Sequence, residues 1–189
     1  RLVTVPLSQG AGQYRALGRM ITLGKSDDVY DRLQRAWQNL HLTETEAEMR
    51  GLSIPGAGAF DPNEKPLVVV VSSMAGGAGA SMALDVCRIL TMVNGIDPFL
   101  IAVFMVAPNI FEGLSGDAIT GVRANALAML GEIVASQTGA AREHDVDLLR
   151  ALGLDNGEGA QKPFNRVFPV GLYVGAERTR FGDGTPMPV

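Results

Sequence analysis

The sequence has few of the residues on which several classes of protein depend. Its single cysteine, Cys87, cannot form an internal disulfide, which fits the reducing environment of the cytoplasm. Its two histidines, His41 and His144, stand in isolation and lack the spacing of metal ligands, so we expect no transition-metal site. The longest apolar run, residues 99–107, is far shorter than the roughly 18 residues that a transmembrane helix requires. No signal peptide is visible at the start of the chain.

Positive charge is also scarce. The 189 residues include 16 Lys and Arg against 20 Asp and Glu, a net charge of −4, whereas a nucleic-acid surface needs clustered Lys and Arg. We therefore expect no nucleic-acid partner, no membrane span and a cytoplasmic location. A composition of 47% hydrophobic and 19% charged residues excludes a disordered chain, and the length suits one domain. Because the chain begins at Arg1 rather than Met, we expect it to be part of a longer protein.

Apolar runs and turn residues predict an α/β fold. The continuous apolar run of residues 67–71 predicts a strand that is buried on both faces, as in a parallel sheet covered by helices on each side. Further strands are predicted over residues 1–7, 99–106 and 167–174, and loops over residues 51–66, 156–163 and 181–188. Apolar spacing predicts helices over residues 13–22, 43–50, 81–93, 118–136 and 142–152, and one that starts at Ser26. The order strand, turn, helix, strand is a βαβ unit, so we expect a mostly parallel sheet with helices on both faces.

Two helices carry more specific expectations. Leu17 and Ile21 lie four residues apart and predict the buried side of the first helix. Ser26 is predicted to cap the second helix, with Asp27 and Asp28 in the positive first turn.

The glycine-rich turn over residues 72–80 is the most informative segment. It follows a predicted buried strand and precedes a predicted helix, and helix N-termini bind anions, phosphate above all, through their free N–H groups. Gly76, Gly77 and Gly79 would supply those groups, while Ala80 and Ser81 would open the helix. A tight turn that needs small residues for packing alone is the other interpretation of this segment.

Three known patterns compete for the turn. A Walker A loop needs a Lys before Ser or Thr, and none is present here. A dinucleotide fingerprint needs a last glycine where this chain has Met82, and an acid on the next strand, which is apolar. The third pattern is the tubulin and FtsZ signature GGGTGSG or GGGTGTG, which the turn resembles as Ala75-Gly76-Gly77-Ala78-Gly79-Ala80-Ser81.

Three further segments resemble motifs of the same family in the same order. The segment GAGQYRALGR, which begins at Gly10, resembles the loop that caps the terminal phosphate of GTP in tubulin and FtsZ. The segment VFMVAPNIFEG places Glu112 where FtsZ has a ribose-binding glutamate. Phe181-Gly182-Asp183 resembles a triplet whose aromatic residue stacks on guanine. Nearly the whole chain therefore resembles the tubulin/FtsZ superfamily, and most of all the divergent bacterial tubulin-like proteins.

The resemblance implies that residues 1–189 are part of a single nucleotide-binding domain for GTP or GDP, with Mg²⁺ carried between the phosphates. The family's first phosphate loop would lie upstream, and its hydrolytic loop downstream, so this chain offers no assigned catalytic residue. A homo-oligomer or filament is expected, in which a neighbouring subunit completes hydrolysis. The nucleotide-binding residues it implies are Gly10, Ala11, Gly12, Gln13, Ala75, Gly76, Gly77, Ala78, Gly79, Ala80, Ser81, Glu112 and Phe181.

Departures from the family pattern leave a second interpretation open. Ala78 and Ala80 replace two signature hydroxyls, and hydrogen bonds to a charged oxygen contribute about 1.5–3 kcal/mol each. The FtsZ arginine that follows the FEG segment is absent, and the nearest basic residue, Arg123, falls in a predicted helix. A non-catalytic, tubulin-like scaffold that mediates protein–protein assembly is therefore the alternative. A degenerate ATP-binding fold is a third, weaker one.

Other polar and aromatic residues have structural interpretations. Cys87 and Trp37 lie on apolar helix stripes and are expected in the core. Asp85 is interpreted as a partner of the helix dipole in preference to a group that supports the binding site, and Asn125 as a surface or capping residue in preference to a polar contact. Tyr14 is left between two roles, packing under its loop or facing the nucleotide.

Overall fold

The computed structural model of the chain describes residues 11–53, 55–56, 58–111, 113, 120–154, 162–176 and 178–180. The strand predicted over residues 1–7 and the closing loop over residues 181–188 lie outside them. Most of residues 156–163 does so as well.

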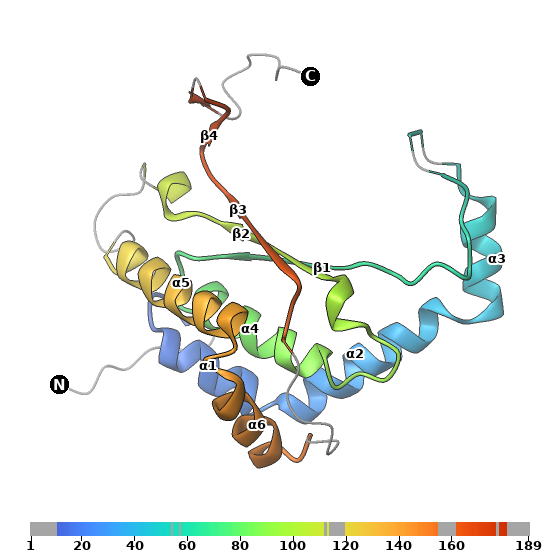
Figure 1. Cartoon of the computed structure of the whole chain (residues 1–189), viewed down its shortest axis with the longest axis horizontal. Helices are drawn as coiled ribbons and strands as arrows, with labels where there is room; N and C mark the ends of the chain where they lie inside the picture. The colour runs from blue at the N-terminus through green and yellow to red at the C-terminus, as the bar shows by residue number, and fades with distance from the viewer. Residues whose placement is uncertain are drawn as a thin grey trace.

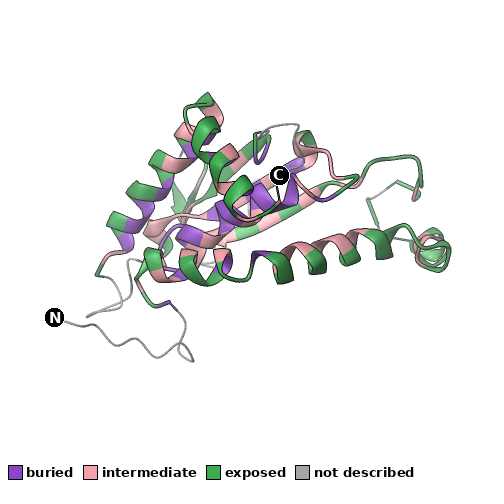
Figure 2. Ribbon diagram, turned by 90° about the horizontal axis from the view of Figure 1, so that it is seen from below, coloured by how far each residue is buried: buried purple, intermediate pink, exposed green. Residues whose placement is uncertain are grey.

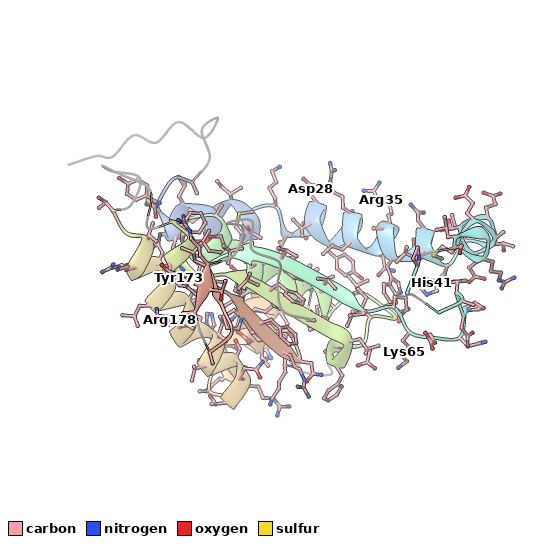
Figure 3. The ribbon with its side chains drawn as sticks, turned by 90° about the horizontal axis from the view of Figure 1, so that it is seen from above. Asp28, Arg35, His41, Lys65, Tyr173 and Arg178 are labelled. Atoms are coloured by element: carbon pink, nitrogen blue, oxygen red, sulfur yellow. The ribbon has the colours of Figure 1, made fainter. Side chains whose placement is uncertain are left out.

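Three parallel strands form the sheet on which the fold is built. They are β1 (Val68–Ser73), β2 (Ile101–Val106) and β3 (Arg166–Val170), hydrogen-bonded in that order. The register places Val70 beside Val103, and Val103 beside Val167 (Figure 1). Two short antiparallel strands, β4 (Tyr173–Val174) and β5 (Thr179–Arg180), form a separate hairpin in which Arg178 lies over the Tyr173 ring (Figure 3). The predicted α/β class with a parallel sheet is confirmed.

The third strand is shorter than predicted. A continuous strand over residues 167–174 is wrong, because β3 ends at Val170 and the chain turns before β4. The neighbouring strand β2 has already ended at Val106, and its last pairing partner is Val170. Beyond that point the main chain bonds to a side chain instead, since Leu172 N–H donates to Asn109 Oδ1 at 3.3 Å. In the described part of the chain, β2 therefore offers no residue beyond Val106 with which a longer β3 could pair.

The described ranges contain six α-helices, which lie close to the predicted positions and differ from them at the ends. Two short 3₁₀ turns, η2 (Pro98–Leu100) and η3 (Pro108–Phe111), flank β2. The helices are α1 (Arg15–Leu23), α2 (Ser26–Leu40), α3 (Thr43–Gly51), α4 (Gly79–Leu90), α5 (Val122–Thr138) and α6 (Arg142–Ala151).

The predicted cap of α2 is wrong. Lys25 occupies the cap position and makes no side-chain capping bond, while Ser26 is buried as the first helical residue. Asp27 and Asp28 do lie in the first turn, where the helix dipole favours negative charge.

The hydrophobic core lies between the sheet and helices α4 and α5. Alternate residues of β2 are fully buried against these helices, as the period of a strand dictates. On the opposite face of the sheet, Val69 and Val71 are 50% and 69% exposed, and the Phe104 and Phe168 rings stack at 4.9 Å. Helices were expected on both faces of the sheet. In the described part of the chain they cover one face only (Figure 1). The buried core residues are Met74, Ala80, Ala83, Leu84, Cys87, Leu90, Ile101, Val103, Met105, Ala126, Met129, Ile133 and Phe164.

The first helix buries a different side from the predicted one. Gly18 and Thr22 are its buried residues, whereas Ile21 is 38% exposed. The reason is the close approach of α1 to the chain just before and within α4, where only a glycine fits. A β-carbon on Gly18 would lie 3.1 Å from Ala78 Cα.

Helix α2 starts beside α4 and then leaves the body of the molecule. Trp37 is half-buried against Gly95, which has a positive φ of 96°, and Leu33 packs on the core. Past this point the helix is exposed and leads to α3 (Figure 2). Asp28 and Arg35 point away from the sheet on its outer side (Figure 3). Of the helices in the described ranges, none is long and apolar enough to cross a membrane.

Candidate functional site

The glycine-rich turn connects β1 to α4 at the carboxyl end of the sheet, the edge at which open α/β sheets bind ligands. The two serines that end β1 brace the turn. Ser72 Oγ donates to the Gly79 carbonyl at 3.1 Å, and Ser73 Oγ accepts from Ala75 N–H at 3.1 Å. A β-carbon on Gly79 would lie 2.8 Å from the Ser73 carbonyl oxygen, so position 79 requires glycine. Sequence reasoning did not single out these serines.

The loop that precedes α1 packs directly on this turn. Gly77 N–H donates to the Gly12 carbonyl at 2.7 Å, and Gly12 has a positive φ of 54°. A β-carbon on Gly77 would lie 2.7 Å from Tyr14 N, so the loop and the turn touch through their backbones. The structure thus brings Ala11, Gly12 and Gln13 against residues 75–81, although 64 residues separate Ala11 from Ala75 in the chain.

Asn125, in the first turn of α5, connects the loop and the turn by hydrogen bonds. Its side-chain amide donates to Gln13 O at 3.1 Å, Gln13 Oε1 at 2.9 Å and Ala75 O at 3.0 Å, and the residue is 8% exposed. The interpretation of Asn125 as a surface or capping residue is wrong. Its only sequence signal is an amide in the first turn of the helix, four residues after Gly121.

Several main-chain N–H groups of the turn make no hydrogen bond within the described chain. The N–H groups of Gly77, Ala80 and Ser81 already donate to carbonyls within the protein. Those of Gly76, Ala78 and Gly79 have no acceptor in the part of the chain that the structure describes. Helix α4 has no side-chain cap and no acidic residue in its first turn. The positive end of the helix dipole is therefore uncompensated, which suits an anion.

Two of the predicted site residues face inward instead. Ser81 is 4% exposed and donates its hydroxyl to Gly77 O at 2.5 Å. Ala80 is fully buried in the core. A threonine hydroxyl at position 80 would point into the core, so only the missing hydroxyl at Ala78 removes a donor from the open side of the turn.

Two arginines of α1, Arg15 and Arg19, are already paired. Arg15 donates to Ala80 O at 2.8 Å and to Glu132 at 2.7 Å, which joins α1, α4 and α5. Arg19 Nε lies 3.1 Å from Asp85 Oδ2. A phosphate at the turn would therefore rely on main-chain N–H groups rather than on Arg15 or Arg19.

Asp85 belongs to a buried ion-pair network rather than to the helix end. It is 1% exposed, and Arg88 bridges it to Asp145 with contacts of 2.8 and 2.7 Å. Burial raises the pKa of the Asp85 carboxyl, although Arg19 and Arg88 oppose the shift. The interpretation of Asp85 as a partner of the helix dipole is wrong, because the residue lies in the middle of α4.

The other predicted residues divide into three groups. Gly10, Glu112 and Phe181 lie outside the described residues, although η3, which ends just before Glu112, follows β2 at the same sheet edge as the turn. Tyr14 is 50% exposed at the start of α1. Cys87 is confirmed as a core residue, and burial raises the pKa of its thiol to about 12, which excludes a thiolate nucleophile at neutral pH. No group of three His, Cys, Asp or Glu in the described ranges is placed to hold a metal ion.

Comparison with known families confirms the resemblance. A family model described as "Tubulin like" matches residues 1–183. Because the match spans nearly the whole sequence, the chain belongs to the tubulin-like family. No curated protein and no solved structure matches the sequence.

Proposed function

We propose that this chain binds GTP or GDP at the turn formed by residues 75–79 and the loop formed by residues 11–13. One observation carries the proposal. The hydrogen bond from Gly77 N–H to Gly12 O fastens the loop to the turn, while the N–H groups of Gly76, Ala78 and Gly79 stay without an acceptor in the described chain. An uncapped helix N-terminus with unpaired N–H groups is a suitable phosphate site, and the family match makes a guanine nucleotide the natural ligand.

The proposal assigns a part to each segment. The three N–H groups hold phosphate oxygens, Ala11, Gly12 and Gln13 lie against the terminal phosphate, and Mg²⁺ arrives with the nucleotide. Glu112 for the ribose and Phe181 for the base rest on the resemblance alone. Self-assembly, with hydrolysis completed by a neighbouring subunit, belongs to the same proposal.

A non-catalytic scaffold is the second candidate, and a specific observation favours it. Ala78 offers no hydroxyl to a ligand, and Arg15 and Arg19 already pair with Glu132 and Asp85. A scaffold would assemble equally well with and without nucleotide.

Thermal unfolding of the whole protein with GTP, GDP and ATP, each with Mg²⁺, tests nucleotide binding. A ligand at 100 times its dissociation constant stabilises the folded state by about 2.7 kcal/mol, which is several degrees for a domain of this size. We expect a shift with GTP and GDP but not with ATP. A shift with ATP alone would favour the degenerate ATP-binding fold, and no shift with any of the three leaves the scaffold.

Gly76 is the position at which to test the turn. A β-carbon there would lie 3.8 Å from Gly12 O, an ordinary contact, so Gly76→Ala fits the fold, whereas Gly76→Asp adds a negative charge where phosphate would bind. Gly77 is unsuitable, because its β-carbon would collide with Tyr14. We expect Gly76→Asp to abolish the GTP-induced shift and any GTP-dependent assembly measured by light scattering, and Gly76→Ala to retain both. Assembly that is identical in the two variants, with or without GTP, would support the scaffold.

A further inference from the structure

A cavity lies away from the turn, at the amino ends of strands β2 and β3. Its volume is about 520 Å³, within the range of small-molecule sites. Pro98 and Phe99 just before β2, and Phe164 and Asn165 just before β3, form one side of it. The end of α5 and the start of α6 form the other side. The turn lies at the carboxyl ends of the strands, so the two places are separate.

The walls of this cavity are fastened to one another. Gln137 Nε2 donates to Phe164 O at 3.3 Å, and Asn165 Nδ2 donates to Phe99 O at 2.9 Å. These bonds join α5, η2 and the segment before β3, so no large movement is needed to form the site. A preformed site loses less free energy to ordering when a ligand binds.

The charge lining the cavity is positive. Arg142 and Lys162 line it and are exposed, and α6 begins at Arg142 without a side-chain cap. Asp145 also lines the cavity, but Arg88 neutralises its carboxylate through a contact of 2.7 Å. Glu143 and Asp145 offset the dipole of α6 in its first turn, so the two basic side chains are the groups that favour an anionic ligand.

Ser136 is an independent sign of a ligand. It lines the cavity and is 3% exposed, yet its hydroxyl has no hydrogen-bond partner in the described chain. Buried polar groups are nearly always satisfied, because leaving one without a hydrogen bond costs free energy. A ligand atom within this cavity would supply the missing partner.

We infer that this cavity binds a small amphipathic anion, a phosphate or carboxylate attached to a flat apolar group. Arg142 and Lys162 hold the anionic end. The apolar part lies against Phe99, which is 72% exposed. The hydroxyl of Ser136 bonds to a polar atom of the ligand.

Calorimetric titration of the whole protein with phenyl phosphate tests this inference, with benzyl alcohol as the uncharged analogue. We expect phenyl phosphate to bind and benzyl alcohol to bind at least tenfold more weakly. The double variant Arg142→Gln/Lys162→Gln weakens phenyl phosphate by about tenfold or more, the loss expected when charged hydrogen bonds are removed. Ser136→Ala, which removes a hydroxyl that has no partner in the fold, weakens it a few-fold.

The matched control is Arg35→Gln/Arg150→Gln, which removes the same net charge from exposed positions on α2 and α6. We expect this control to bind phenyl phosphate as the parent does. Equal weakening in both double variants would mean a general charge effect and would overturn the inference. So would unchanged binding in Arg142→Gln/Lys162→Gln, equal affinity for benzyl alcohol, or no binding of phenyl phosphate at millimolar concentration.

Discussion

Gly18 of α1 and Gly77 of the turn are in direct contact. A β-carbon on Gly18 would lie 2.7 Å from the Gly77 carbonyl oxygen and 2.6 Å from Ser81 Oγ. Ser81 Oγ itself donates to Gly77 O, and this hydrogen bond holds both atoms beside Gly18. Helix α1 therefore lies on the turn through a glycine, and the position of the loop before it depends on this contact.

Gly18→Ala is expected to destabilise the protein. Overpacking a tight contact costs about 1–3 kcal/mol, which outweighs the better helix propensity of alanine. Gly131→Ala is the matched control, because that glycine is also helical and its β-carbon would meet open space. This control is expected to gain about 0.5–1 kcal/mol. Denaturant unfolding of both variants measures the difference, and equal stability of the two would contradict the contact.

Asn125→Asp is expected to release the loop from the turn. The carboxylate cannot donate, and it would face the carbonyl oxygens of Gln13 and Ala75, to which Asn125 donates in the parent protein. We expect a loss of about 1–3 kcal/mol and faster hydrogen exchange in the segment before α1. Ala124→Asp, an exposed neighbour in the first turn of α5, places the same charge where the helix dipole favours it. Slow exchange retained in Asn125→Asp would show that another contact holds the loop.

The local pattern of the sequence predicted the fold because hydrophobic periodicity is a property of each segment by itself. The run before the turn, the strand that begins near Phe99 and the helices all appear close to their predicted places. The failures occur where a segment meets its neighbours. The break after Val170 depends on where β2 ends, and the exposure of Ile21 depends on how closely α1 approaches α4.

The site was predictable only as separate motifs. The resemblance identified the loop before α1 and the turn, but not that Gly77 N–H is already occupied by Gly12 O. Asn125 and Asp85 were misinterpreted for the same reason. An amide or a carboxylate on a helix has no periodicity that reveals its partner on another element.

The stability of the protein is expected to fall in alkali through Cys87. Burial raises the pKa of its thiol from 9.0 to about 12, so between these values the unfolded chain loses this proton while the folded chain keeps it. An acid whose pKa is raised in the folded state loses stability as pH rises through the unfolded pKa. From about pH 8 to about pH 10 this contribution is on the order of 1 kcal/mol.

Comparison with Cys87→Ala isolates this effect, because the two proteins differ only at the thiol. The free energy of unfolding should fall less steeply with pH in Cys87→Ala, even though the variant is less stable at neutral pH through its smaller side chain. The parent thiol should also resist alkylation until the protein unfolds. Parallel pH profiles, or rapid alkylation of the folded protein, would contradict the buried neutral thiol.

Arg88 is expected to be the most sensitive residue of the buried network. Arg88→Met leaves Asp145 without its partner and Asp85 with Arg19 alone, and breaking a buried ion pair costs about 3–5 kcal/mol. The triple variant Asp85→Leu/Arg88→Met/Asp145→Leu leaves no unpaired carboxylate, so it should be more stable than Arg88→Met alone.

The stability of Arg88→Met should depend on pH with a definite sign. Without Arg88 the pKa of the Asp85 carboxyl is raised further in the folded state, so the variant regains stability as pH falls and this carboxyl is protonated. Urea unfolding at neutral and mildly acidic pH measures this, and a loss in Arg88→Met that is the same at both would show that the carboxylates remain neutralised by other groups.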